Sequence, residues 1–231
     1  MFRLRSPDVV VSQHEHSRIS GELARRWGNE RFDTPELDTN AFVAGVTLHD
    51  WHYGVQDTLS LDAEHVSRRD EETWRDWVAV HARSSELRMD DPIVEIVAKM
   101  HIRRLLDDVD RDDAERVRRT LESRIDELIA SSAIPRQRFE WADHITRACD
   151  LLAFYLFRED HTSGEFEVPT RAGSLETIQM RYEMGIGTDI RVDPWPFDRD
   201  AIELNYVAYD RDSYPSTQRP VMMRLGVHRL V

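Results

Sequence analysis

Residues 148–157 read Ala-Cys-Asp-Leu-Leu-Ala-Phe-Tyr-Leu-Phe and contain a single charged side chain, that of Asp150. This apolar run predicts the buried part of a long helix over residues 136–158. Burying a lone carboxylate is costly unless a cation or strong hydrogen-bond donors compensate its charge. We therefore interpret Asp150 either as the ligand of a bound cation or as the partner of a buried arginine. Cys149 beside it is interpreted as a core residue.

Cap and turn patterns upstream of this run predict further helices. Ser12 and Glu15 form a capping-box pattern, so the first helix should begin there and end before Gly28. Thr34 and Pro35 predict the start of a second helix, with Thr34 as the N-cap and Pro35 in the first turn. Three more helices are expected over residues 71–87, 91–106 and 110–131, and residues 51–69 are expected to form a loop.

The chain changes character after Gly164. Short runs over residues 176–184, 189–192, 201–209 and 221–227 predict strands separated by Gly, Pro and Asp. A further buried strand is expected at the Val-Val-Val run of residues 9–11. The predicted fold class is therefore mainly α, with a helical domain over residues 1–162 and a small β-rich C-terminal appendage over residues 163–231.

The charge balance is strongly acidic. Acidic residues outnumber basic ones 44 to 31, the net charge is −13, and Lys99 is the one lysine of the chain. Because molar salt screens repulsion beyond about 3 Å, this composition favours a halophilic, salt-loaded interior. A GC-rich genome that replaces lysine with arginine would produce the same bias. In either case the absence of a basic stripe argues against a nucleic-acid partner.

Composition also bears on the compartment. No apolar run approaches the roughly 20 residues that a membrane span requires, so we expect no membrane association. Cys149 is the one cysteine, which excludes an internal disulfide and gives no sign of export. The apolar run near the N-terminus is too short for the core of a signal peptide. These features predict a soluble cytoplasmic protein.

Two histidines are predicted to point inward from their helices. His16 shares a helical face with Ile19 and Leu23, and His101 shares one with Val97. His49 and Asp50 are adjacent at the predicted end of the second helix. There the backbone can turn both side chains toward one metal ion, and their N and O atoms suit Zn, Mn, Fe or Ni. Each inward histidine is also compatible with an ordinary hydrogen-bonded core position.

Taken in chain order, these residues resemble the H…HD…D signature of the HD superfamily of helical metal-binding domains, over residues 1–158. The resemblance implies an HD-like helical bundle with His16, His49, Asp50 and Asp150 as metal ligands. It further implies His101 as a candidate ligand of a second metal. The implied cofactor is one or two divalent ions (Mn, Fe, Zn, Ni or Mg).

The whole chain also resembles an uncharacterised family, the domain-of-unknown-function family 3891. That resemblance supplies no reaction. The matching motifs are Gln13…His16…Ser20-Gly21…Leu23-Ala24…Trp27-Gly28, His49-Asp50-Trp51, Cys149-Asp150-Leu151-Leu152 and Pro194-Trp195-Pro196-Phe197.

The function that the HD resemblance implies is metal-dependent hydrolysis of a phosphoester or nucleotide-like substrate, with a small phosphorylated molecule as partner. A second ion or the substrate phosphate would be held by His101, with His144 as a further candidate. His52 and Asp57, shortly after the HD pair, are candidates for positioning phosphate or water. Arg18 is a candidate phosphate contact or, alternatively, a solvated surface arginine.

Two other functions remain open from the sequence. One is a di-iron HD-type oxygenase, which the same histidines and carboxylates would permit. The other is a catalytically inactive binding module that uses the aromatic Trp195-Pro196-Phe197 segment as a docking surface. The same aromatic residues would instead seal the β-rich segment onto the helices if they are buried.

Overall fold

The computed structural model describes residues 2–4, 8–54, 71–158, 162–174, 176–185 and 189–230. Within these residues the helices are α1 (Gln13–Arg25), α2 (Thr39–Leu48), the short 3-10 helix η1 (Trp51–Tyr53), α5 (Glu71–Glu86), α6 (Pro92–Leu105), α7 (Asp112–Ser132) and α8 (Arg136–Leu156). The strands are β1 (Phe2–Leu4), β2 (Val9–Val11), β3 (Ser163–Pro169), β4 (Thr177–Met184), β5 (Asp189–Asp193), β6 (Ala201–Asp210) and β7 (Pro220–Arg229).

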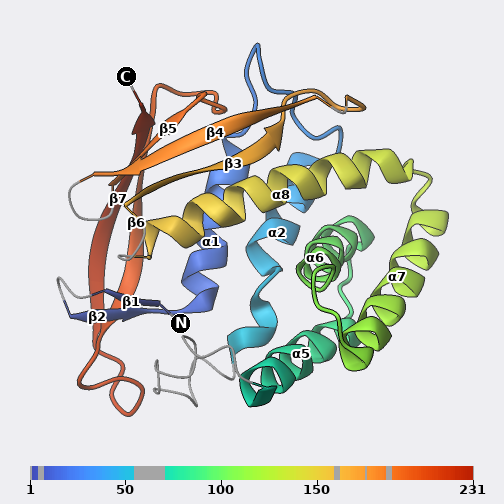
Figure 1. Cartoon of the computed structure of the whole chain (residues 1–231), viewed down its shortest axis with the longest axis horizontal. Helices are drawn as coiled ribbons and strands as arrows, with labels where there is room; N and C mark the ends of the chain where they lie inside the picture. The colour runs from blue at the N-terminus through green and yellow to red at the C-terminus, as the bar shows by residue number, and fades with distance from the viewer. Residues whose placement is uncertain are drawn as a thin grey trace.

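The described strands form one mixed sheet in the order β1-β2-β6-β7-β5-β4-β3. Its neighbours pair antiparallel except β5 and β7, which are parallel. Figure 1 shows α1 and α8 lying against this sheet, with α2, α5, α6 and α7 on the side away from it. The molecule is therefore layered, with one sheet backed by helices.

The predicted fold class is wrong, because the described residues form an α/β fold rather than a helical bundle with a small β appendage. Two strands from the N-terminal segment, β1 and β2, extend the sheet, and β2 pairs with β6 near the other end of the chain. The sequence pattern missed β1 and β3 altogether. A pairing across about 200 residues depends on which edge is left open in the folded sheet, and local periodicity carries no information about that.

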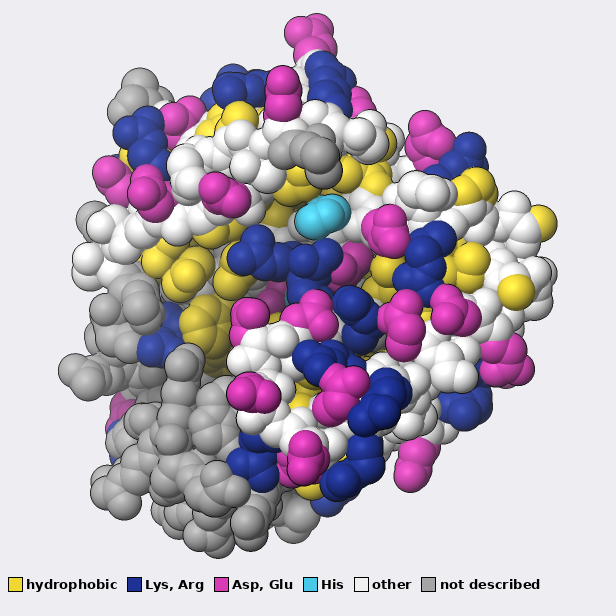
Figure 2. Space-filling model, turned by 45° about the vertical axis from the view of Figure 1, so that its right-hand side comes forward, with side chains coloured by type: hydrophobic (Ala, Val, Ile, Leu, Met, Phe, Trp, Pro, Cys, Tyr) yellow, Lys and Arg dark blue, Asp and Glu magenta, His cyan; other side chains and the backbone are white. Residues whose placement is uncertain are grey.

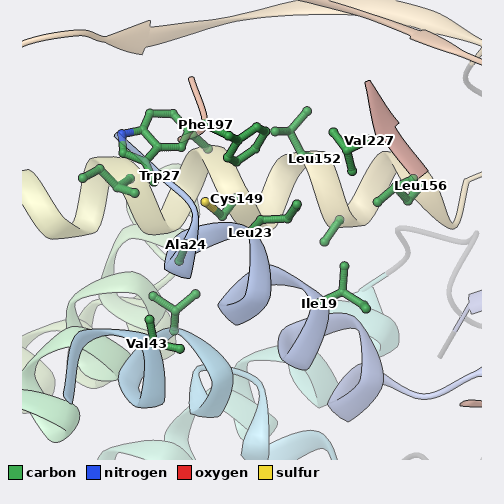
Figure 3. Close-up of a cluster of buried hydrophobic side chains, with 14 of the residues drawn as sticks. Ile19, Leu23, Ala24, Trp27, Val43, Cys149, Leu152, Leu156, Phe197 and Val227 are labelled. Atoms are coloured by element: carbon green, nitrogen blue, oxygen red, sulfur yellow. The ribbon is translucent and has the colours of Figure 1, made fainter. Parts of the chain in front are cut away.

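One hydrophobic core joins the helices to the sheet. Figure 3 shows Ile19 and Leu23 of α1 facing Leu152 and Leu156 of α8, with Val227 of β7 close by. All five side chains are at most 2% exposed. The core thus continues across the predicted boundary between residues 162 and 163. Cys149 lies in the same core, as expected, and is fully buried.

The first helix begins where the capping pattern predicts. The Ser12 hydroxyl accepts the Glu15 amide at 3.1 Å. The Glu15 carboxylate, however, accepts the amide of Val207 on β6 at 2.8 Å, so it fastens the start of α1 to the sheet. An acidic side chain in the first turn is also favoured by the helix dipole.

The second helix begins later than predicted. Asp38, rather than Thr34, is its N-cap, and the Asp38 carboxylate accepts the Ala41 amide at 2.9 Å. The carbonyl of Thr34 instead accepts the indole N–H of Trp141 on α8 at 3.2 Å. A tertiary contact therefore uses the segment that the Thr-Pro pattern assigned to the helix start.

The remaining predicted helices correspond to α5, α6, α7 and α8, and the four predicted C-terminal strands to β4, β5, β6 and β7, with ends shifted by at most three residues. Of the predicted loop over residues 51–69, the first three residues form η1, and residues 55–69 lie outside the described part of the chain. None of the described helices is long and apolar enough to cross a membrane.

The Trp195-Pro196-Phe197 segment seals the sheet onto the helices. Trp195 is 8% exposed and Phe197 is 1% exposed. The Phe197 ring meets Trp27 edge-on, with ring centroids 6.0 Å apart, and the Asn29 side chain donates to the Trp195 carbonyl at 2.9 Å. Because these aromatic side chains are buried, they offer no docking surface.

The one lysine of the chain, Lys99, is 2% exposed, so the basic side chains on the surface are arginines. Its ammonium group donates to the carbonyls of Ser84 and Ser85 at the end of α5, at 2.9 and 3.2 Å. On the face shown in Figure 2, arginine and acidic side chains alternate around hydrophobic ones. Arginine also forms partly exposed ion pairs such as Arg103–Glu122, at 2.7 Å.

Candidate metal centre

Three helices bring four predicted ligands together. His16 lies on α1, His49 and Asp50 follow the end of α2, and Asp150 lies on α8. One potential ligand atom from each side chain lies within 4.8 Å of all the others. The two histidines and Asp50 are at most 5% exposed, and the Asp150 side chain is 15% exposed. The centre is therefore buried, with limited solvent access at Asp150.

Close helix packing makes this convergence possible. A Cβ atom on Gly21 of α1 would lie 2.1 Å from the Thr47 hydroxyl oxygen on α2. A Cβ atom on Gly45 of α2 would lie 2.6 Å from the Cβ of Val97 on α6. Because glycine lacks that atom, α1, α2 and α6 approach closely enough for their histidines to meet.

The geometry centres on Asp150. Its Oδ1 atom lies 2.8 Å from Nε2 of His16 and 3.0 Å from Nε2 of His49. The Oδ2 atom of Asp50 lies 3.4 Å from Nε2 of His49 and 3.8 Å from Nε2 of His16. Two imidazole nitrogens and two carboxylates therefore face one small volume.

Within the described residues, no arginine or lysine pairs with Asp50 or Asp150, although the chain has 31 basic residues. Among these residues Asp150 therefore has no buried arginine partner, which was the alternative interpretation of its charge. Histidines are the groups that face both carboxylates. Buried carboxylates without a permanent cation are a donor set that a divalent metal ion would neutralise.

The electrostatics of the four side chains reflect this mutual dependence. Burial lowers the pKa of His49, but the charges of Asp50 and Asp150 and hydrogen bonds to both outweigh it and raise that pKa well above its usual value. Burial raises the pKa of Asp150, but the neighbouring imidazoles of His101, His16 and His49 outweigh it and hold that pKa well below its usual value. The raised pKa of His49 favours its positively charged form beside the two carboxylates.

A backbone contact fixes the orientation of His49. Its Nδ1–H donates to the Val46 carbonyl at 2.6 Å, which leaves Nε2 free to face the carboxylates. Metal-binding histidines typically donate their second ring N–H to a carbonyl or carboxylate in this way. The donor set and its orientation therefore fit a divalent metal ion.

Residues 5–210 match the family described as protein of unknown function, DUF3891. The chain belongs to the DUF3891 family. The matched region includes all four predicted ligands and extends from the N-terminal segment to the end of β6. No curated protein and no solved structure matches the chain. The sequence resemblance to this family is confirmed, whereas the resemblance to the HD superfamily stays a prediction.

The DUF3891 chain places more histidines beside the four ligands. The ring of His101 on α6 is 4.7 Å from that of His49, and its Nε2 lies 3.5 Å from Oδ2 of Asp150. His52 of η1 and His81 of α5 have ring centroids 4.9 Å apart. The Nε2 atoms of His52 and His81 are buried without a hydrogen-bond partner among the described residues.

Burial keeps this second pair of histidines neutral. It lowers the pKa of His52 to about 3 and that of His81 to about 4, in each case helped by a neighbouring histidine. The Nδ1–H of His81 donates to the Trp77 carbonyl at 2.8 Å, which leaves its Nε2 as an unused acceptor. Neutral buried imidazoles with a free nitrogen are potential metal ligands.

Sequence reasoning did not identify His81 or Asp143, a buried carboxylate that faces His101. His81 follows Trp77 by four positions and Val78 by three, so it shares their helical face, and this was the signal available for it. Asp143 lies seven residues before Asp150 and so shares its helical face. That spacing was the signal available for Asp143.

Two other predicted site residues, Arg18 and His144, do not belong to the cluster of four ligands. The guanidinium of Arg18 binds the Glu15 carboxylate, at 2.8 and 3.0 Å, and the Asn205 carbonyl on β6 at 2.6 Å. These contacts place Arg18 where α1 packs on the sheet, outside the cluster. His144 is half-buried on α8, and burial followed by the charge of Arg104 lowers its pKa. Asp57 lies outside the described residues.

Proposed function

We propose that this DUF3891 protein is a metal-dependent phosphohydrolase that acts on a small phosphorylated molecule. The observation that carries the proposal is the buried pair Asp50 and Asp150, which face His16 and His49 and have no arginine or lysine partner among the described residues. A structural polar cluster would be more stable with a fixed cation or an apolar replacement. A ligand set for a divalent metal ion explains why carboxylates and imidazoles converge here.

In this proposal, His16, His49, Asp50 and Asp150 would hold the ion. A bound divalent ion supplies Lewis-acid chemistry, since it polarises a phosphoryl oxygen and acidifies water. Asp150 retains some solvent access, and we propose that substrate approaches on its side.

His101 and His52 would hold a second ion or the substrate phosphate, and His81, whose Nε2 is an acceptor, would hold an ion. Their support is the proximity of His101 to Asp150 and the unpartnered Nε2 atoms of His52 and His81. The same histidine-rich set would suit two irons, so an oxygenase is the second candidate function. The identity and number of the ions separate the two candidates, because phosphohydrolysis needs no redox-active metal.

The test begins with metal analysis of protein purified in high salt without chelator. Wild type should contain one or two equivalents of a divalent metal, and His49→Ala should lose most of it. His228→Ala is the matched control, because His228 is a half-buried histidine on β7 that does not belong to the cluster. The control should retain the wild-type metal content.

Metal-loaded proteins are then assayed with phosphomonoesters, phosphodiesters and nucleotides. We expect phosphate release by wild type and His228→Ala and at least a hundredfold loss in His49→Ala. A metal-free, well-folded wild type would contradict the metal centre. A metal-loaded wild type with two irons that consumes oxygen but releases no phosphate would contradict phosphohydrolysis and favour the oxygenase.

A further inference from the structure

The imidazole of His101 lies between two carboxylates. Its Nε2 is 3.5 Å from Oδ2 of Asp150, and its Nδ1 is 3.8 Å from Oδ1 of Asp143. His101 is fully buried and Asp143 is 3% exposed. Neither ring nitrogen has a hydrogen-bond partner among the described residues, and nor has Oδ1 of Asp143. Unsatisfied buried polar atoms are rare, and here two of them, Nδ1 of His101 and Oδ1 of Asp143, face each other.

The other oxygen of Asp143 is already engaged. Its Oδ2 accepts from Nε of Arg104 at 2.5 Å, and a second guanidinium nitrogen also contacts it. Arg104 follows His101 by three positions, so both residues project from the same side of α6. Arg104 therefore neutralises and orients Asp143, and it leaves Oδ1 directed toward the imidazole.

The proton inventory of imidazole explains this arrangement. A neutral imidazole carries one N–H, and coordination through Nε2 requires that proton to be on Nδ1. A buried Nδ1–H then needs an acceptor, and Oδ1 of Asp143 is the polar atom that faces it. A small rotation of the ring toward Asp143 would close the 3.8 Å gap to a hydrogen bond while Nε2 still points at the centre.

We propose that Asp143 is a positioning residue that accepts the Nδ1–H of His101 and thereby holds Nε2 toward the metal centre. This inference rests on the metal centre of the proposed function and is independent of the reaction catalysed there. The alternative is a purely structural role, in which Asp143 only pairs with Arg104 and so joins α8 to α6. The two roles differ in one respect, since only the positioning role acts through His101.

The test measures zinc affinity by competition with a chromophoric chelator on the full-length protein. Asp143→Asn should weaken zinc binding about ten- to a hundredfold, the usual effect of removing such an outer partner. The matched control is Glu95→Gln. Glu95 is also a buried carboxylate paired with an arginine, Arg124 at 2.9 Å, and no histidine pairs with it in the described part of the chain. Glu95→Gln should keep the wild-type zinc affinity.

A double-variant cycle separates positioning from packing. If Asp143 acts through His101, adding Asp143→Asn to His101→Ala should cause no further loss of zinc affinity. In zinc-loaded wild type, nitrogen NMR should assign the proton of His101 to Nδ1 and show it protected from exchange. That measurement needs no variant, so it stands even if Asp143→Asn does not fold.

The outcomes are distinguishable. Wild type that binds no zinc would overturn the metal centre, and this proposal with it. Wild type that binds zinc while Asp143→Asn and Glu95→Gln both retain its affinity would overturn the positioning role alone. An additive loss in the double variant, or a proton of His101 found on Nε2, would do the same.

Discussion

The Nε2 atom of His16 lies 2.8 Å from Oδ1 of Asp150, although 134 residues separate the two in the chain. The contact joins the first helix to the last, and both helices lie against the same sheet (Figure 1). The core beneath the sheet therefore fixes the distance between these two ligands. Substitutions at the ligands should mainly weaken metal binding, whereas substitutions in that core should mainly lower the unfolding free energy.

Replacing Asp150 by Asn tests whether metal binding stabilises the fold. At a metal concentration of a hundred times Kd, wild type should gain about 2.7 kcal/mol of unfolding free energy. If the substitution raises Kd a hundredfold, the gain at the same concentration falls to about 0.4 kcal/mol. Denaturant titrations with and without metal measure both values. Equal gains in the two proteins would show that Asp150 is not a ligand.

Acid should destabilise the protein partly through Glu95. Burial raises the pKa of Glu95, but hydrogen bonds from Arg124 and the Met89 amide outweigh it, and the pKa lies below its usual value of 4.5. Ionised Glu95 therefore contributes stability above about pH 4.5, and that contribution is lost as pH falls through the lower folded-state pKa. Glu95→Gln should be about 1.5–3 kcal/mol less stable at pH 7.

The pH dependence of the two proteins provides the check. Because Gln does not titrate, the unfolding free energy of Glu95→Gln should fall less steeply than that of wild type below pH 4.5. Urea denaturation at pH 3.5, 4.5 and 7 measures the difference. Parallel curves would show that the pKa of Glu95 is the same in the folded and unfolded states.

Cys149 should be chemically inert in the native protein. It is fully buried, and burial followed by the charge of Asp150 raises its pKa well above the usual value. Thiolate is the reactive form, so both accessibility and ionisation oppose reaction. A colourless disulfide reagent should titrate about one thiol per chain in denaturant and almost none in native buffer at pH 8. Rapid native labelling would contradict the packing of α8.

Leu152→Ala should test the core that joins the helices to the sheet. Leu152 is fully buried between α8 and the strands, as Figure 3 shows. The substitution leaves a cavity and should cost about 2–5 kcal/mol of unfolding free energy. Exposed Met222 on β7, 66% accessible, supplies the control, since Met222→Ala should change stability by less than about 0.5 kcal/mol. Similar losses in both variants would argue against the shared core.

The sequence by itself predicted most helices, because caps and periodic apolar residues act within a few positions of one another. It also placed His16 and His101 on inward faces, and the structure buries both. Asp150 stood out because a charge within an apolar run requires compensation. These are local signals, whereas the set of four ligands was what the resemblance to the HD signature implied.

Only the tertiary structure decided how the strands pair and what faces Asp150. The addition of β1 and β2 to β6, and the burial of Trp195 and Phe197, depend on which edges and surfaces remain open once the core has formed. The sequence pattern also did not predict that histidines rather than arginines surround Asp150, or that His101 contacts Asp143. Such contacts depend on distances between helices, which close packing at Gly21 and Gly45 sets and which local sequence does not encode.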